Sequence, residues 1–175
     1  MLTNKLAEMI NLNENLTVFI DMDGVLAKYD RYAYDKNNGP EPGIALFEHK
    51  NSHYFRHCTP DNNAIEILNM LLSQNNIAVF ILTTVADHIQ WAIDDKTQWL
   101  NQHCPKIDPT SQLITASSDK TEIIKAIRKT KTLDSSMILI DDFNKNLMQW
   151  ASSGGTAIKY LNGINSPESW TGLKI

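Results

Sequence analysis

Few of the features that define specialised protein classes occur in this sequence. Its 175 residues include only two cysteines, Cys58 and Cys104, whose spacing fits neither a zinc knuckle nor a CxxC redox site. No block of like charges occurs, and the net charge of -4 argues against a general nucleic-acid-binding surface. No apolar stretch approaches the length of a membrane span, and the first residues lack the basic start and apolar run of a signal peptide. We therefore expect a cytoplasmic protein that does not contact a membrane.

What the sequence does contain is the pattern of one α/β domain. Hydrophobic residues make up 42% of the chain, which is enough to build a core in a single domain over residues 1–175. Five short apolar runs predict buried strands, at Thr17–Ile20, Ile77–Leu82, Gln112–Ala116, Met137–Ile140 and Thr156–Tyr160. Strands that alternate with helices indicate a Rossmann-like three-layer sandwich with a mostly parallel five-stranded sheet.

Amphipathic patterns predict the helices that separate these strands. They lie within Met1–Asn15 and at Asp61–Ser73, Ala86–Gln102, Lys120–Lys131 and Asn144–Ser152. Thr59, followed by Pro60, is the predicted N-cap of the second helix, and Gly154-Gly155 is a stop signal for the last one. We interpret the tail after Tyr160 as a loop.

One segment, residues 29–58, interrupts the alternation directly after the first strand. It shows no strand or helix period apart from a possible turn near Ile44–His49, and we interpret it as a small cap insertion. Its aromatic residues are Tyr29, Tyr32, Tyr34, Phe47, Tyr54 and Phe55, and its histidines are His49, His53 and His57. The aromatic rings could stack a nucleobase, but packing of the loop onto the domain explains more than half of them. The histidines could bind a metal if they were helical, although ordinary partly exposed histidines are the preferred interpretation.

Carboxylates follow two of the predicted strands. Asp21 and Asp23 come after the first strand, and Asp141 and Asp142 come after the fourth. In parallel sheets, ligands bind beyond the carboxyl ends of the strands, so these side chains point to a functional site. Such a cluster needs a cation, and an all-oxygen ligand set favours Mg²⁺.

Two further groups suit a bound phosphoryl group. The hydroxyl of Thr83, at the end of the second strand, can orient a phosphate oxygen, and the ammonium of Lys120, at a helix start, can neutralise its charge. A carboxylate nucleophile can then take the phosphoryl group, and a second carboxylate two residues on can act as acid and base. Thr84 is an alternative phosphate binder, and Lys125 is an alternative to Lys120. The aspartates could also be ordinary caps or turn formers.

These motifs resemble the four-motif signature of the haloacid dehalogenase superfamily. The match spans Thr17 to Asp142 and consists, in order, of Asp21-x-Asp23-Gly24-Val25, a strand that ends in Thr83, Lys120 at a helix start, and Asp141-Asp142. The resemblance implies a strand order that places the first and fourth strands side by side.

The resemblance also implies a role for each of these residues. Asp21 would be the nucleophile, and Asp23 would be the general acid and base, with a backbone carbonyl that also binds Mg²⁺. Thr83 and Lys120 would bind the phosphoryl group. Asp141 would be a metal ligand, and Asp142 a ligand through water or a partner of the ligands. An aspartate at position 23 favours a phosphatase, because the dehalogenase branch lacks it and the ion-pumping branch has threonine there. Since an unperturbed aspartic acid has a pKa of about 3.9, the pKa of Asp23 must be raised if it is to act as an acid near neutral pH.

Within the superfamily, the wording of the motifs is similar to that of the 5'(3')-deoxyribonucleotidase group and its bacterial relatives. Asp21-Met22-Asp23-Gly24-Val25-Leu26, Phe80-Ile81-Leu82-Thr83 and Leu139-Ile140-Asp141-Asp142 carry this likeness. The chain departs from that group in its cap, because an insertion as short as residues 29–58 predicts a more open site.

We therefore predict a magnesium-dependent phosphomonoesterase that forms an aspartyl phosphate and acts on small phosphate esters, with nucleoside monophosphates as the first hypothesis. One alternative is a phosphatase of another metabolite or of a phosphorylated macromolecule. Another is a non-catalytic module that binds phosphate or Mg²⁺, although the presence of Asp23 argues against it. A homodimer is plausible on general grounds alone.

Overall fold

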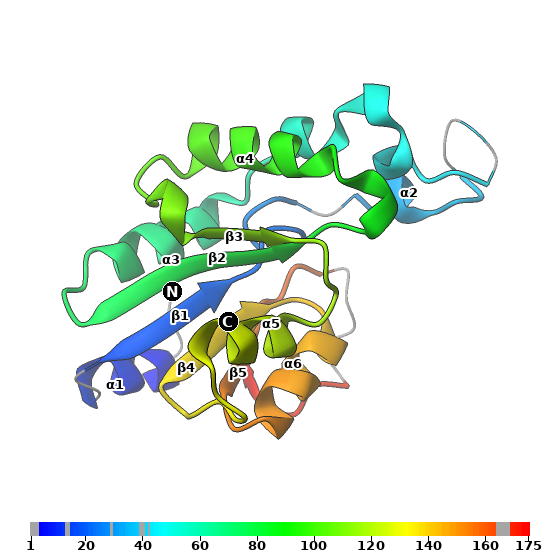
Figure 1. Cartoon of the computed structure of the whole chain (residues 1–175). Coiled ribbons are helices and arrows are strands. Elements are labelled where there is room, and N and C mark those ends of the chain that lie inside the picture. Colours follow the sequence, from blue (N-terminus) through cyan, green and yellow to red (C-terminus); the bar gives the residue numbers. More distant parts are fainter. Residues whose placement is uncertain (1–3, 13–14, 29, 39–40, 42, 164–168) are drawn as a thin grey trace.

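The chain folds around a six-stranded sheet in which neighbouring strands are parallel (Figure 1). The computed structural model describes residues 4–12, 15–28, 30–38, 41, 43–163 and 169–175. The strands are β1 (Leu16–Ile20), β2 (Ile77–Thr84), β3 (Gln112–Thr115), β4 (Met137–Asp141), β5 (Thr156–Lys159) and β6 (Leu173–Lys174). Their order in the sheet is β3-β2-β1-β4-β5-β6, so that β1 and β4 are neighbours, as expected.

The sixth strand corrects the prediction of a five-stranded sheet. β6 pairs with the outer side of β5 through Ile158 and Leu173, within the tail that we interpreted as a loop. Two residues are too short a segment to show the period-two alternation by which a strand is recognised in a sequence. This strand therefore forms because it pairs with β5, and no local sequence pattern predicts it.

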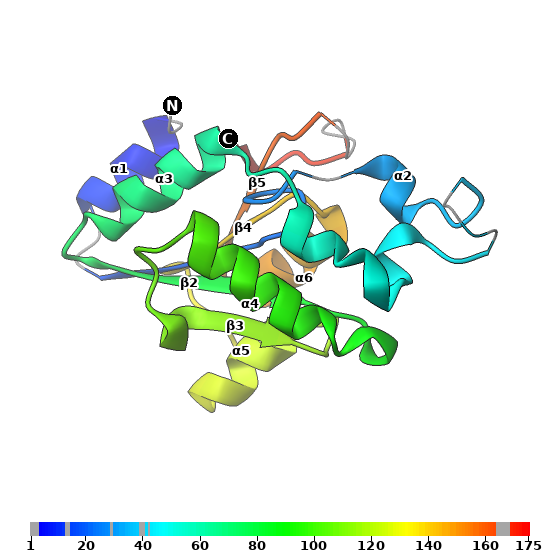
Figure 2. The same cartoon turned by 90° about the horizontal axis from the view of Figure 1, so that it is seen from above.

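Helices cover both faces of the sheet (Figure 2). The longer ones are α1 (Asn4–Leu12), α3 (Asn62–Leu72), α4 (Ala92–His103), α5 (Lys120–Arg128) and α6 (Asn144–Ser152). Helices α1, α3 and α4 lie on one face, and α5 and α6 lie on the other. The result is the predicted three-layer sandwich. None of the helices in the described part of the chain has the length and apolar character needed to cross a membrane.

The two faces of the strands build two separate apolar cores. Alternate residues of β1 illustrate this, because Val18 and Ile20 are buried under α1, α3 and α4, whereas Phe19 is buried under α5 and α6. On the second face, the ring of Trp150 from α6 meets the Phe19 ring edge-on at a centroid distance of 5.2 Å. Strands that are buried on both faces explain why the apolar runs in the sequence are continuous.

Two predicted helix starts differ from the structure. The N-cap of α3 is Asp61, whose carboxylate accepts hydrogen bonds from the backbone N–H groups of Asn63 and Ala64, so the assignment of this role to Thr59 was wrong. α4 begins at Ala92 rather than Ala86, because a short 3₁₀-helix, Asp87–Ile89, and a turn precede it. The last helix agrees with its prediction and ends before Gly154, which adopts a φ of +101°.

The segment that we predicted to form a small cap consists of short helical turns. We call residues 30–58 the insertion; Tyr29 lies outside the described residues. Its elements are α2 (Arg31–Tyr34) and three 3₁₀-helices, η1 (Leu46–Glu48), η2 (Lys50–Ser52) and η3 (Tyr54–His57). These turns share a third small core with the start of α4, in which Ala33, Tyr54, Phe55, Val85, Ile89 and Ala92 are buried.

The register of the central strands decides what lies at their carboxyl ends. Ile20 on β1 pairs with Ile140 on β4, and each of these residues directly precedes an aspartate, Asp21 and Asp141. The backbone N–H of Asp21 donates to the carbonyl of Ile140 at 3.0 Å. The two aspartates therefore leave neighbouring strands at the same level.

Candidate active site

Three carboxylates are buried together at the ends of β1 and β4. Asp21, Asp141 and Asp142 each place an oxygen within 4.8 Å of the others, and their residues are 7%, 0% and 4% exposed. Lys120, the first residue of α5, lies between two of them, with Nζ at 2.8 Å from Asp21 Oδ1 and 2.7 Å from Asp141 Oδ2. One ammonium thus offsets part of the repulsion in a cluster from which water is largely excluded.

Hydrogen bonds from the loops beyond the strands fix the directions of these carboxylates. The N–H of Met22 donates to Asp21 Oδ1 at 2.8 Å, and the N–H of Phe143 donates to Asp141 Oδ1 at 2.7 Å. The amide of Asn146, on the first turn of α6, donates to Asp141 Oδ2 at 2.9 Å. Because backbone groups supply two of these donors, the orientation of the acids is part of the fold itself.

Asp142 is held against the loop that follows β1. The amide of Asn162, beyond β5, donates to Asp142 Oδ2 at 2.6 Å and to the carbonyl of Gly24 at 3.0 Å. Gly24 has a φ of +77°, and a Cβ at this position would lie 2.3 Å from Asp142 Oδ2. Only glycine therefore allows both the turn and the close approach of this carboxylate.

Asp23 and Thr83 meet at a buried lysine from α4. Lys96 is fully buried, and its Nζ lies 2.7 Å from Asp23 Oδ2, 2.9 Å from Thr83 Oγ1 and 2.8 Å from the carbonyl of Thr84. The side chain of Asp23 is 25% exposed, whereas Thr83 is almost completely buried. This arrangement places a carboxylate and a hydroxyl on one cation, beside the acid cluster.

Burial raises the pKa of two of these acids. For Asp23, desolvation is the largest cause of a raised pKa; the charge of Lys96 opposes it and the charge of Asp21 adds to it. For Asp141, desolvation again raises the pKa against the opposing charge of Lys120. The pKa of Lys120 is also raised, because the attraction of Asp141 and Asp21 outweighs the largest single effect, desolvation, which lowers it. Asp23 therefore has the direction of shift that a general acid requires.

The structure brings together most of the residues that the sequence singled out. Asp21, Asp23, Thr83, Lys120, Asp141 and Asp142 all lie at this edge of the sheet. Thr84 instead lines a second hollow, together with Ala116, Ser117 and Ser118. Lys125 pairs with Glu122 at 2.9 Å on the surface of α5, away from the carboxylates.

Sequence reasoning missed three residues of the site: Lys96, Lys159 and Asn162. Lys159, on β5, is fully buried and donates to the carbonyl of Asp142 at 2.8 Å. For Lys96 a signal existed, because it shares a helix face with Ala92, Trp99 and Leu100, all of which are buried. A lysine within the apolar stripe of an amphipathic helix is unusual, so Lys96 could have been recognised from the sequence as a candidate site residue. No comparable pattern marks Asn162, which follows the last long strand in a loop.

A cavity of about 520 Å³ lies between the insertion and the loop after β1. Its lining includes Lys28, Asp30, Tyr32, Tyr54, His57 and Cys58. Tyr32 is 69% exposed and free to meet a ligand. Tyr34 instead packs on Phe47 at a centroid distance of 4.5 Å. The insertion's aromatic residues therefore divide between a pocket and a small core.

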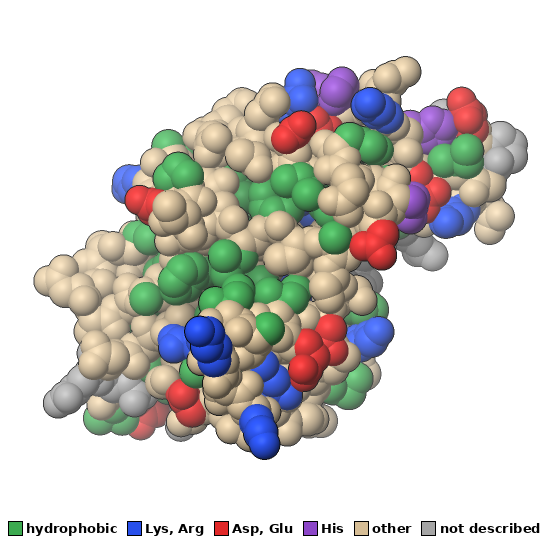
Figure 3. Space-filling model, in the orientation of Figure 1, with side chains coloured by type: hydrophobic (Ala, Val, Ile, Leu, Met, Phe, Trp, Pro, Cys, Tyr) green, Lys and Arg blue, Asp and Glu red, His purple; other side chains and the backbone are tan. Residues whose placement is uncertain are grey.

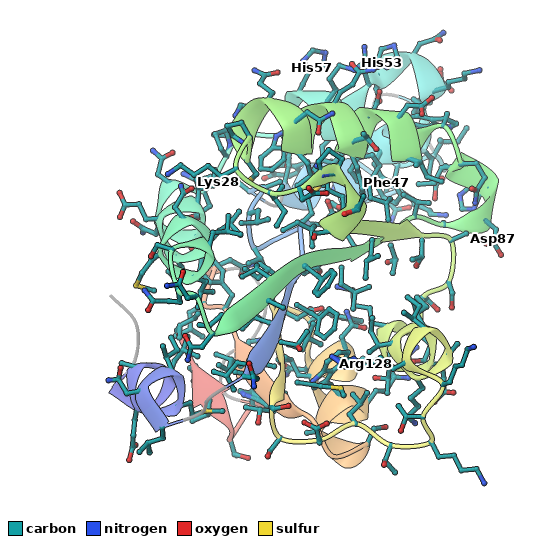
Figure 4. All side chains as sticks on the ribbon, turned by 60° about the vertical axis from the view of Figure 1, so that its left-hand side comes forward. Lys28, Phe47, His53, His57, Asp87 and Arg128 are labelled. Carbon is teal, nitrogen blue, oxygen red and sulfur yellow. The ribbon has the colours of Figure 1, made fainter. Side chains whose placement is uncertain are left out.

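The histidines of the insertion do not form a metal site among the described residues. Histidine and charged side chains gather over the insertion in Figure 3. Figure 4 shows His53 and His57 beyond α4, on the side away from the sheet. His53 contacts Asp95 of α4, with its Nδ1 at 3.1 Å from Oδ1. Within the described ranges, the only group of acids, histidines or cysteines close enough to hold a metal is Asp21, Asp141 and Asp142.

These three acids fit a magnesium ion in their chemistry. All their donor atoms are carboxylate oxygens, which are the hard ligands that Mg²⁺ prefers over thiolate or imidazole. Their mutual distances of up to 4.8 Å allow a single ion to contact all three with small movements of the side chains. Asp21 and Asp141 also share the ammonium of Lys120, so some positive charge already lies among these carboxylates.

One protein family matches most of the chain. The profile of the family described as 5' nucleotidase, deoxy (pyrimidine), cytosolic type C protein (NT5C) matches residues 30–166. The matched stretch begins after Asp21 and Asp23, so the family match does not depend on the first motif. No curated protein matches the chain at a significant level.

Several solved structures share the fold at low sequence identity. A hydrolase from Pseudomonas syringae is 16% identical, with a TM-score of 0.59 and coverage of 91% of this chain and 92% of its own. A HAD-superfamily hydrolase from Ehrlichia chaffeensis is 13% identical, with a TM-score of 0.54 and coverage of 94% and 92%. A putative HAD-like phosphatase from Mesorhizobium loti is 11% identical, with a TM-score of 0.51 and coverage of 85% and 72%. At such identities the likeness concerns the fold.

Proposed function

Because the chain belongs to the 5' nucleotidase, deoxy (pyrimidine), cytosolic type C family of HAD-type phosphatases, we propose that it is a magnesium-dependent phosphomonoesterase of nucleoside monophosphates. The observation that carries the proposal is the set of four carboxylates at two neighbouring strand ends, with Lys120 and Thr83 beside them. A nucleophile, an acid and two phosphate-binding groups thus lie within one small volume.

In the first step, Asp21 attacks the phosphorus. Met22 N–H and Lys120 both hold Oδ1 of Asp21, which leaves Oδ2 to form the new bond to phosphorus. The ester P–O bond breaks, and the leaving oxygen takes a proton from Asp23. The raised pKa of Asp23 keeps a larger fraction of this carboxyl protonated near neutral pH than an ordinary aspartic acid would have.

In the second step, water hydrolyses the aspartyl phosphate. Asp23, now ionised, takes a proton from the water as the oxygen attacks phosphorus, and the bond to Asp21 breaks to release inorganic phosphate. Lys120 and the hydroxyl of Thr83 stabilise the charge on the phosphoryl oxygens in both steps. Asp21, Asp141, Asp142 and the carbonyl of Asp23 would hold the Mg²⁺, which neutralises charge on the phosphoryl group when bound.

The preference for nucleotides rests on the family and on the cavity under the insertion. Tyr32 and Tyr54 line a space of about 520 Å³, which is large enough for a nucleoside, and rings of this kind stack on bases. The same cavity is open enough for another metabolite or for a phosphorylated side chain of a macromolecule. A panel of phosphate esters separates these substrates by their relative kcat/KM.

The test is release of inorganic phosphate from nucleotides and sugar phosphates, with and without Mg²⁺. We expect Mg²⁺-dependent turnover by the wild type, and loss of at least about 10³-fold in kcat for Asp21→Asn. Asp134→Asn is the matched control, because Asp134 is an exposed aspartate that precedes β4, at the opposite end of that strand from the site. Turnover that survives Asp21→Asn would overturn the aspartyl-phosphate route, and no turnover on any ester would favour the non-catalytic module.

A further inference from the structure

Lys96 is a fully buried charge that the reaction described above does not use. It lies on α4, between the insertion and the sheet, with Nζ 4.7 Å from the centre of the Phe55 ring. A buried ammonium is costly unless its hydrogen bonds and charge are satisfied by partners. The partners of Lys96 therefore indicate why the fold keeps a lysine at this position.

All three N–H groups of Lys96 are engaged. They reach Asp23 Oδ2, Thr83 Oγ1 and the carbonyl of Thr84 at 2.7, 2.9 and 2.8 Å. Since an ammonium group has three donors and no acceptor, none remains for a substrate. Lys96 is thus not a second phosphate-binding lysine beside Lys120.

The same hydrogen bonds fix the direction of the Thr83 hydroxyl. Because an ammonium can only donate, Thr83 Oγ1 must accept from Lys96. The hydroxyl hydrogen is then free to point away from Lys96 and to donate to a phosphoryl oxygen. Without Lys96, the hydroxyl could rotate and donate to the carboxylate of Asp23 instead.

The orientation of Asp23 follows from the same contact. Oδ2 is held by Lys96, so that Oδ1 is the oxygen left to carry a proton toward the leaving group or to take one from water. A quarter of the Asp23 side chain is exposed, so a substrate can reach this carboxylate. A carboxylate that rotated freely would present the wrong oxygen for part of the time.

We propose that Lys96 is a positioning residue that orients both Asp23 for proton transfer and Thr83 for phosphoryl binding. This inference rests on the proposed phosphatase activity and adds to it a residue that links the two groups. It also assigns a task to the insertion. Phe55 covers Lys96, and Arg56 pairs with the adjacent Asp95 at 2.7 Å, so the insertion keeps this part of α4 against the site.

The experiment compares two esters that differ in their need for an acid. An alkyl phosphate, such as a nucleoside 5'-monophosphate, must have its leaving oxygen protonated, whereas 4-nitrophenyl phosphate releases a weakly basic phenolate without that help. For Lys96→Met we expect kcat/KM on the alkyl ester to fall about 10²-fold or more, because kcat/KM reports the first step, in which the leaving oxygen is protonated, and not the later hydrolysis that both esters share. We expect the fall in kcat/KM on the nitrophenyl ester to be at least about ten-fold smaller.

Lys159→Met is the matched control for the loss of a buried lysine. Lys159 is equally buried but contacts the carbonyl of Asp142 and the side chain of Asn144, and neither Asp23 nor Thr83. Its substitution should lower kcat/KM on both esters by the same factor. Equal losses on both esters for Lys96→Met would show a merely structural role and would overturn the proposal.

Two further variants keep the test decisive. If Lys96→Met does not fold, as judged by circular dichroism, Lys96→Gln retains a neutral donor and should show the same ester dependence to a smaller extent. In an Asp23→Asn background, Lys96→Met should no longer discriminate between the esters, because its partner is already lost. Discrimination that persists there would overturn the assignment. If the wild type hydrolyses neither ester, the proposed function itself fails, and Lys96 has no reaction to serve.

Discussion

The strand ends and the insertion differ in how their polar groups are buried and bound. At the strand ends, most carboxylates are buried, and backbone N–H groups, lysines or a side-chain amide hold them, as for Asp21, Asp141 and Asp142. In the insertion, charged and aromatic groups lie on short helical turns, and their exposure ranges from buried Phe55 to Tyr32, which is 69% exposed. We therefore expect the first region to carry out the proposed chemistry and the second to contact the substrate.

The sharpest test of this contrast uses one glycine from each region. Gly24→Ala should lower the free energy of unfolding by about 2 to 4 kcal/mol and kcat by about 10²-fold, because its Cβ would displace Asp142 and its φ is positive. Gly43→Ala has the same backbone strain, with a φ of +88°, but no atom within 4 Å of the new Cβ. It should cost about 1 kcal/mol and leave kcat unchanged.

Urea unfolding and steady-state kinetics on both glycine variants measure these effects. Similar losses of activity for the two variants would remove the distinction between the regions.

A second test concerns how the insertion is attached to α4. Asp95 is buried and pairs with Arg56, whose side chain is 33% exposed. Arg56→Met should lower the free energy of unfolding by about 1 to 3 kcal/mol, less than for a fully buried pair because water partly screens the arginine. Lys36→Met, which removes a pair with Glu48 in which the lysine is 59% exposed, should cost less than about 1 kcal/mol.

Limited proteolysis would locate the effect of Arg56→Met. Cleavage should become faster within the insertion and stay slow in the sheet. Faster cleavage throughout the chain would mean that the two regions unfold as one unit.

The third test separates binding from chemistry within the insertion. Tyr32→Ala should raise KM for a nucleotide about five-fold or more, since a ring that stacks on a base contributes at least about 1 kcal/mol. The value of kcat should not change, because Tyr32 does not touch the acids. Tyr34→Ala removes a ring that packs on Phe47 and should lower stability while KM changes little. An unchanged KM for Tyr32→Ala would direct the search for the base-binding surface elsewhere.

The smallest expected effect concerns the reactivity of the two cysteine thiols. Burial raises the pKa of Cys58, in the insertion, and of Cys104, after α4, to about 12. At pH 8 only about one thiol in 10⁴ is then ionised, and the reactive fraction should rise about ten-fold with each pH unit. Alkylation by iodoacetamide should therefore be slow for both. Cys58 should react faster than Cys104 if the insertion opens, and equal rates would argue against separate opening.

Much of the strand-end site could be predicted because it follows from local sequence and a topological rule. An apolar run that ends in Asp21 or Asp141 marks both the strand and the position of its end, and parallel strands bring such ends together. Gly24 could be recognised within its motif, but its reason, the close approach of Asp142, depends on a contact across the sheet.

Strand ends and the topological rule do not place Lys96 or Asn162 in the site, although the position of Lys96 on the buried face of α4 was a separate signal. Both reach the site from residues far along the chain, Lys96 through the packing of α4 on the insertion and Asn162 through a loop after β5. The secondary structure of the insertion could not be predicted either, because its 3₁₀-turns have three or four residues and thus no period to detect. The two-residue β6 escaped prediction for the same reason.

The balance of charge at the strand ends also bears on how the protein would respond to loss of the proposed magnesium ion. Four carboxylates there face three buried ammonium groups, from Lys96, Lys120 and Lys159. Unlike a zinc finger, whose ligands cannot stay together without the ion, this site carries its own counter-charges. Chelation should therefore abolish activity without unfolding the protein. One divalent ion could then be exchanged for another while the enzyme stays folded.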